Sequence, residues 1–165
     1  LSGGGVLMYN AVHSIDKLIF LTKSKITKVF AQSNNINNNL AVEDTITIVL
    51  TFKNGIIANL IAVFAPYKTN ARWETKIFGT KGSISLKIRE SLFYQTNTIN
   101  KNYDYINYYK KFGPNYNFYL QARSFVKSLS SNKKPFVTIE EGIDSVKIVN
   151  AVYESIKLKK TITIK

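Results

Sequence analysis

Residues 45–64, TITIVLTFKNGIIANLIAVF, decide the fold, because they predict two antiparallel strands and the turn between them. Residues 45–52 place Ile46, Ile48 and Leu50 on one side and mainly threonines on the other, which is the two-residue period of a strand. Asn54-Gly55 follows, and this pair supplies the positive φ of a tight hairpin turn. Residues 56–64 then predict the partner strand, so the chain contains an antiparallel sheet.

Segments on both sides of this hairpin extend the sheet. Further strands are expected at residues 26–32, 73–78, 83–88, 92–95 and 161–164. Residues 79–82, GTKG, join two of these strands as a second hairpin. Two asparagine-rich stretches, 33–39 and 97–117, are expected to be irregular.

Three segments have the period of amphipathic helices. Residues 6–21 place Met8, Ala11, Val12, Ile15, Leu18 and Ile19 on one stripe and Tyr9, His13, Asp16 and Phe20 on another face. Residues 116–129 repeat apolar side chains at Phe118, Ala122, Phe125, Val126 and Leu129. The third helix begins at a capping box formed by Thr138 and Glu141. Its apolar side is expected at Val146, Val149, Val152, Tyr153 and Ile156.

The order helix, strands, two helices predicts the fold class. We expect an α+β protein with a mainly antiparallel open sheet and helices on one face. Residues 1–165 are expected to form a single domain, because the length suits one ordinary core.

Composition excludes several classes of function. The chain has no cysteine and one histidine, so disulfides and thiolate metal sites are excluded, and we expect no metal. No apolar run reaches the roughly 18 residues of a membrane span, so we expect no membrane partner. These features are compatible with a cytoplasmic protein.

The formal net charge of +13 is typical of nucleic-acid binders, but its pattern is not. Only three of the 23 basic residues are arginines, and the lysines are spread along the chain. We therefore expect no nucleic-acid partner. The alternative is a basic module in which Tyr103, Tyr105, Tyr108 and Tyr109, beside Lys110 and Lys111, stack on bases.

Tyr9, His13 and Asp16 are neighbours on the first helix, because they are spaced by four and three residues. A histidine beside a carboxylate suits a general acid/base, although the same spacing also occurs in structural pairs. The glycines of residues 2–5, SGGG, match neither the GxGxxG nor the GxxxxGK(S/T) spacing of nucleotide-binding loops. No cofactor-binding residue is therefore assigned.

Residues 2–16, SGGGVLMYNAVHSID, resemble the signature that opens the C-terminal domain of the glucose–fructose oxidoreductase, inositol dehydrogenase and MocA-type (Gfo/Idh/MocA) family. Later segments are similar to that family in the same order, namely residues 42–45, 52–55, 73–74, 77–83, 140–142 and 151–155. The resemblance spans nearly the whole chain.

This resemblance implies a domain with the dihydrodipicolinate-reductase-like C-terminal fold. It implies that a Rossmann domain, absent from this chain, binds NAD or NADP and supplies a catalytic lysine. It also implies a carbohydrate-like substrate and a homo-oligomer formed through the open sheet face. The candidates for that interface are Ile46, Ile48, Leu50, Ile57, Leu60 and Ala62.

The resemblance also implies roles for single residues. His13 matches the family's catalytic histidine, and Asn10 falls where the family often has a substrate contact. Tyr9 stands where the family has an aspartate; a phenol is neutral at pH 7 but can donate a hydrogen bond to a substrate hydroxyl. Arg72, with Tyr67, lies in a loop before Trp73 that either faces the substrate or is solvated.

The resemblance therefore implies the substrate-side domain of an NAD(P)-dependent oxidoreductase acting on a sugar, a cyclitol or a related hydroxyl or carbonyl compound. The alternative is a non-catalytic paralogue kept for sugar binding or for assembly.

Overall fold

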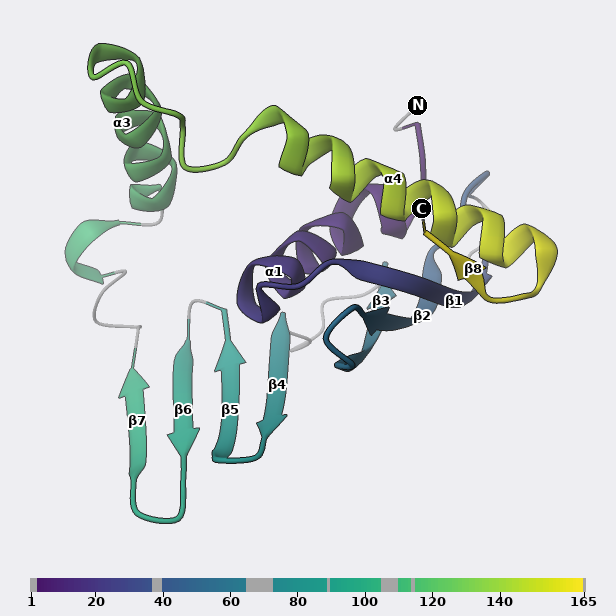
Figure 1. Cartoon of the computed structure of the whole chain (residues 1–165), viewed down its shortest axis with the longest axis horizontal. Coiled ribbons are helices and arrows are strands. Elements are labelled where there is room, and N and C mark those ends of the chain that lie inside the picture. The colour runs from purple at the N-terminus through teal and green to yellow at the C-terminus, as the bar shows by residue number, and fades with distance from the viewer. Residues whose placement is uncertain are drawn as a thin grey trace. The chain divides into compact units, whose positions relative to one another are not determined.

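The computed structural model describes residues 3–36, 40–64, 73–88, 90–104, 110–113 and 115–164 (Figure 1). The chain divides into two compact units: unit 1 contains Leu1–Lys68 and Val137–Lys165, and unit 2 contains Thr69–Phe136. In the described part of the chain the strands form two four-stranded sheets, and every strand pair is antiparallel. The prediction of an antiparallel α+β fold is confirmed.

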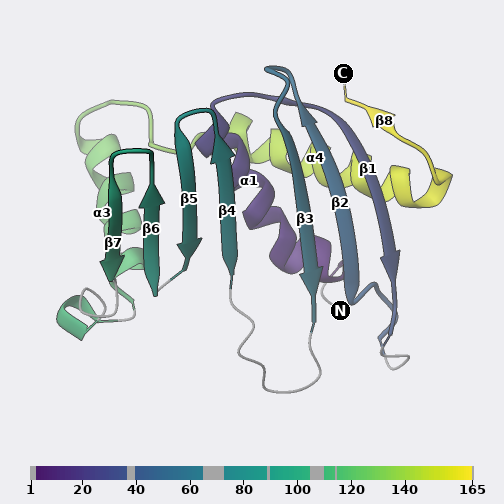
Figure 2. The ribbon, with the colours of Figure 1, turned by 90° about the horizontal axis from the view of Figure 1, so that it is seen from below.

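Unit 1 packs helices on one face of its sheet. The strand order is β3-β2-β1-β8, and Figure 2 shows α1 and α4 on the same side of these strands. The elements are η1 (Leu7–Ala11), α1 (Val12–Thr22), β1 (Ile26–Asn34), β2 (Thr45–Phe52), β3 (Ile57–Val63), α4 (Ile139–Leu158) and β8 (Ile162–Thr163).

The predicted β2–β3 hairpin is confirmed, and its register places Thr51 opposite Ile57. Gly55 has φ +86°, a conformation that suits glycine, and its amide donates to the carbonyl oxygen of Phe52 at 3.0 Å. This turn sets which side chains of both strands face the helices.

The core of unit 1 lies between this sheet and the helices. Ile46, Ile48, Leu50 and Phe52 of β2 are buried with Ile15 of α1. On α4 the buried face consists of Ser145, Ile148, Val149, Ala151, Val152 and Ser155. Val146, predicted on the apolar side, is 42% exposed, because the buried face is centred on Ile148 and Val152.

Five of the six residues predicted for the interface lie on the core side of the sheet, so that prediction was wrong for them. Ile46, Ile48, Leu50 and Leu60 are buried, and Ala62 packs against the core. Both faces of β2 and β3 carry apolar side chains, so the sequence alone did not show which face the helices cover. Of the six, Ile57 lies on the uncovered face, where it is 68% exposed.

Unit 2 contains the sheet β4-β5-β6-β7 and one long helix. Its elements are β4 (Glu74–Gly79), β5 (Gly82–Lys87), β6 (Ser91–Gln95), β7 (Asn100–Asp104) and α3 (Tyr116–Ser130). The second hairpin is confirmed, with Gly79 opposite Gly82. Helix α3 is also confirmed, although Phe118, Phe125, Val126 and Leu129 are exposed.

Strand β7 corrects the prediction that residues 97–117 are irregular. Thr96 closes the preceding turn: its amide donates to the carbonyl oxygen of Ile99 at 2.7 Å, and its Oγ1 accepts from the amide of Ile99 at 3.0 Å. All five residues of β7 are exposed, so the strand has no apolar alternation that sequence patterns could detect. Pairing with β6 holds it in the sheet.

Across the described residues, no helix is both long enough and apolar enough to span a bilayer.

Candidate functional site

The helix that carries the predicted site is built from two parts. Its first turn, η1, is a π-helix in which the amide of Val12 donates to the carbonyl oxygen of Leu7, and α1 continues from Val12. π-Turns within helices are frequent at functional sites. Leu7, Ala11 and Ile15 are buried, so the helix is anchored in the core along that side.

The predicted polar face of this helix faces outward. Tyr9 is 65% exposed and His13 is also exposed, whereas Asn10 is half-buried. The Tyr9 ring packs edge-on against Phe64, with ring centroids 5.9 Å apart. Burial lowers the pKa of Lys17, which lies one turn after His13. Three of the four predicted site residues, Tyr9, Asn10 and His13, thus lie on this helix, and Arg72, with Tyr67, lies outside the described residues.

The start of the helix is held by Glu43, which precedes β2. The carbonyl oxygen of Glu43 accepts from the amide of Val6 at 2.9 Å, and its carboxylate Oε1 accepts from the amide of Leu7 at 3.2 Å. The first amides of a helix have no partner within the helix, and a negative charge near them is favourable. Glu43 therefore acts as a cap supplied from a distant part of the chain.

Tyr153 of α4 completes this cap. Its hydroxyl donates to Oε1 of Glu43 at 3.0 Å, and the backbone amides of Gly5 and Met8 also interact with the phenol oxygen. Burial, together with the hydrogen bond to the Glu43 carboxylate and its charge, raises the pKa of Tyr153 to about 12. The phenol thus stays protonated and keeps donating to the carboxylate. We call Glu43 and Tyr153 the N-terminal clamp.

The clamp bears on whether this chain could hold a nucleotide phosphate. A helix N-terminus binds phosphate through its free amides. Here the amides of Val6 and Leu7 are engaged by Glu43, whose carboxylate would repel a phosphate. The residues present therefore do not fit a dinucleotide at this glycine-led turn, in line with the absence of loop spacing in residues 2–5.

A groove of about 600 Å³ lies beside the clamp. Its lining includes Gly3, Gly4, Asn35, Glu43 and Tyr153, but none of the predicted site residues. The Oδ1 atom of Asn35 is buried and accepts no hydrogen bond within the part of the chain that the structure covers. Tyr9 and His13 thus lie outside this groove, on an exposed face.

The clamp residues were not predicted from the sequence as site residues. Glu43 and Tyr153 are 110 positions apart. Tyr153 was expected only on the apolar side of its helix. No periodicity or spacing links two residues at such a separation.

No cluster of three or more histidine, aspartate or glutamate side chains suited to a metal ion occurs among the described residues.

The comparison with known families shows to which family the chain belongs. The profile of the Gfo/Idh/MocA C-terminal domain, described as "Oxidoreductase family, C-terminal alpha/beta domain", matches residues 1–164. This chain belongs to the Gfo/Idh/MocA oxidoreductase family. The resemblance noted from the sequence is thereby confirmed.

Two proteins match almost the whole length of this chain. The uncharacterized oxidoreductase YrbE of Bacillus subtilis (strain 168) is 24% identical over 171 residues, which cover 99% of this chain and 49% of that protein. An oxidoreductase domain protein from Kribbella flavida has the same fold, with a TM-score of 0.86, 19% identity, and coverage of 99% of this chain and 51% of that one.

A levoglucosan dehydrogenase, in a structure with NADH and levoglucosan, also shares the fold. Its TM-score is 0.85 at 18% identity, and the match covers 98% of this chain and 51% of that one. This Gfo/Idh/MocA chain spans about half the length of the relatives that it matches.

Proposed function

We propose that this chain is the substrate-side domain of an NAD(P)-dependent oxidoreductase acting on a sugar, a cyclitol or a related hydroxyl or carbonyl compound. The observation that carries the proposal is the exposed Tyr9–His13 face on a clamped helix, within a chain that matches the C-terminal domain of an oxidoreductase family. The levoglucosan dehydrogenase with NADH supports the nicotinamide and the carbohydrate class.

In this proposal His13 is the general acid/base. An imidazole can accept the proton of a substrate hydroxyl near neutral pH and return it in the reverse direction. Tyr9 donates a hydrogen bond to a substrate hydroxyl, and Asn10 and Arg72 contact the substrate. The nicotinamide, bound mainly by a domain outside this chain, would exchange the hydride with the substrate carbon.

The exposure of Tyr9 and His13 fits a site completed by a second domain. Ligand sites usually bury most of the ligand surface and lie preferentially between domains. Neither side chain lines the groove beside the clamp or the smaller pocket at the other end of α1. A Rossmann domain facing this helix would supply the missing wall.

The test uses the full-length protein. The reading frame upstream of residue 1 should encode a nucleotide-binding GxGxxG segment and a lysine. NADH or NADPH formation is then measured on a panel of sugars and cyclitols. His13→Ala should lower kcat by about 10²-fold, as loss of a general acid/base does. Leu21→Ala, at an exposed position on another face of the same helix, is the matched control and should leave kcat unchanged. Wild-type turnover in His13→Ala contradicts the proposal.

A non-catalytic role is the second candidate, and Tyr9 favours it. A phenol at this position replaces the aspartate of the family pattern, so a carboxylate that orients the histidine is lacking there. A full-length protein that binds a sugar saturably, but transfers no hydride to or from it in either direction, would support this role. Measurable turnover would remove it.

We also propose that the chain forms a homo-oligomer through the uncovered face of the unit 1 sheet. Phe30 and Val49 are paired there across β1 and β2, and Ile57, Ile61 and Val63 of β3 are 68%, 75% and 49% exposed. Contiguous apolar side chains on a surface mark interaction sites. A second copy of the same face is the proposed partner.

A further inference from the structure

A small pocket of about 260 Å³ lies in unit 1, at the end of α1 away from η1. One wall consists of four isoleucines from α1, β1, α4 and the C-terminal segment, namely Ile19, Ile26, Ile148 and Ile164. Ile26 and Ile148 are only 4% exposed, so core packing fixes this wall. Ligand pockets usually measure about 300–1,000 Å³, so this pocket suits a small ligand.

Two lysines lie beside this apolar wall, next to each other just beyond the paired ends of β1 and β2. Ile26 is paired with Phe52, so the preceding Lys25 lies opposite Lys53. The amide of Lys53 donates to the carbonyl oxygen of Lys25 at 2.8 Å, which fixes the two residues side by side. Like charges at opposing positions destabilise a sheet. Neither lysine forms an ion pair with another of the described residues.

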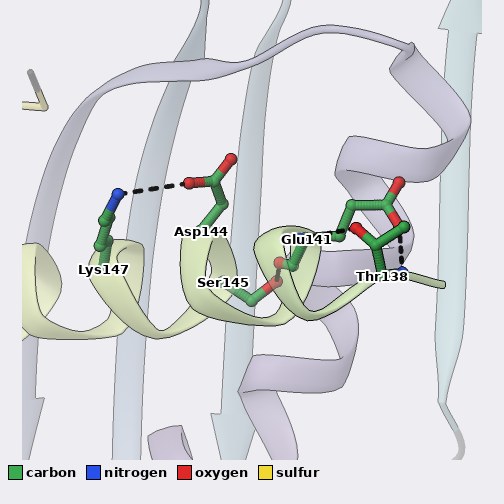
Figure 3. A network of polar contacts seen from close by, with 5 residues as sticks. All are labelled: Thr138, Glu141, Asp144, Ser145 and Lys147. Atoms are coloured by element: carbon green, nitrogen blue, oxygen red, sulfur yellow. Dashed lines mark hydrogen bonds and ion pairs between the residues drawn. The ribbon is translucent and has the colours of Figure 1, made fainter.

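A third lysine reaches the same pocket from α4. Lys147 forms an ion pair with Asp144 at 3.6 Å, and Figure 3 shows both side chains on the same side of the helix. Both are at least half exposed to water, so this pair is weak and easily exchanged. The pocket lining thus includes three lysines and one aspartate.

We propose that this pocket binds a small amphipathic carboxylate. The apolar body of such a ligand packs against the isoleucines, and its carboxylate accepts hydrogen bonds from Lys25 and Lys53. A neutral apolar molecule offers the lysines no opposite charge, and an inorganic anion gains nothing from the isoleucines. The site does not depend on the oxidoreductase proposal, because it shares no residue with Tyr9, Asn10 or His13.

The first measurement compares three probes by calorimetry on the purified chain: octanoate, 1-octanol and inorganic phosphate. We expect saturable one-to-one binding of octanoate, at least about ten-fold tighter than that of either other probe, because only octanoate combines the charge with the apolar body. Absence of octanoate binding, or equal affinity for 1-octanol, overturns the proposal.

The second measurement uses lysine variants. K25Q/K53Q keeps much of each side chain but removes both charges, and octanoate affinity should fall at least about ten-fold. K133Q/K134Q removes the same charge from exposed positions in unit 2 and should bind octanoate like the wild type. Equal losses in both variants would show general charge attraction and overturn the proposal. Circular dichroism and thermal unfolding confirm that both variants are folded, and K25R/K53R should retain the affinity.

Discussion

Gly5 is the residue on which the clamped helix start depends. A Cβ at Gly5 would overlap with the carbonyl oxygen and the side chain of Glu43. Gly5→Ala should therefore displace Glu43 from the amides of Val6 and Leu7 and lower the free energy of unfolding by about 1–3 kcal/mol, as overpacking does. Chemical denaturation measures this change.

Gly142 provides the matched control for this substitution. It lies inside α4, and a Cβ there would meet no atom within 4 Å. Gly142→Ala should stabilise the chain by about 0.5–1 kcal/mol, because alanine favours a helix more than glycine does. If both glycine substitutions changed the free energy of unfolding in the same direction, the result would contradict the close contact between Glu43 and Gly5.

Tyr153 should give the chain a pH dependence in the alkaline range. Its pKa is about 12 in the folded chain and 10.0 for an ordinary tyrosine. The contribution of Tyr153 to the stability of the folded chain is complete below pH 10 and is lost as pH rises from 10 to 12. The reason is that the tyrosine releases its hydroxyl proton at a lower pH in the unfolded chain than in the folded chain. Tyr153→Phe should lack that loss. The absorbance titration of wild type minus variant, in which the nine other tyrosines cancel, should have its midpoint near 12. A midpoint near 10 would contradict the clamp.

At the scale of elements, Ser155 joins β1 to α4 where the sheet ends. Strand β8 pairs only with Lys28 and Val29, so the amide of Ala31 has no partner strand on that side. Oγ of Ser155 accepts from this amide at 3.0 Å and donates to the carbonyl oxygen of Lys160 at 2.7 Å. A buried side chain thus continues the hydrogen bonding of β1 beyond the end of β8.

Ser155→Ala should cost about 1–3 kcal/mol of unfolding free energy, because it leaves a buried donor and an acceptor without their partner. Thermal or denaturant unfolding measures the loss. Ser130→Ala, at an exposed position of α3, is the control and should change stability by less than about 0.5 kcal/mol. Equal effects of the two serine substitutions would show that the edge contact contributes nothing.

At the scale of the whole molecule, the uncovered sheet face predicts self-association. Ile61→Lys places a charge at a position that is 75% exposed on this face, and sedimentation should show a monomer where the wild type shows a larger species. Phe78→Lys alters an exposed apolar residue of unit 2 and should leave the association unchanged. A wild-type chain that stays monomeric at high concentration would contradict the proposed interface.

Local sequence patterns were sufficient to predict most helices and strands and to predict the exposed face of the site helix. Alternation predicted β2, Asn54-Gly55 predicted its turn, and Thr138 with Glu141 predicted the start of α4, where both capping hydrogen bonds are present. The exposed face of Tyr9 and His13 followed from helical spacing alone. These features depend on residues that are close to each other in the sequence, so the sequence by itself determined them.

Only the tertiary structure decided which face of the sheet is open and what holds the site helix. Leu60 and Ile61 are equally apolar neighbours, and the packing of the helices buried one and exposed the other. The clamp joins residues 36 and 110 positions apart, and Lys25 meets Lys53 only through strand pairing. Contacts between residues this far apart in sequence depend on how whole elements pack, and no local pattern records that packing.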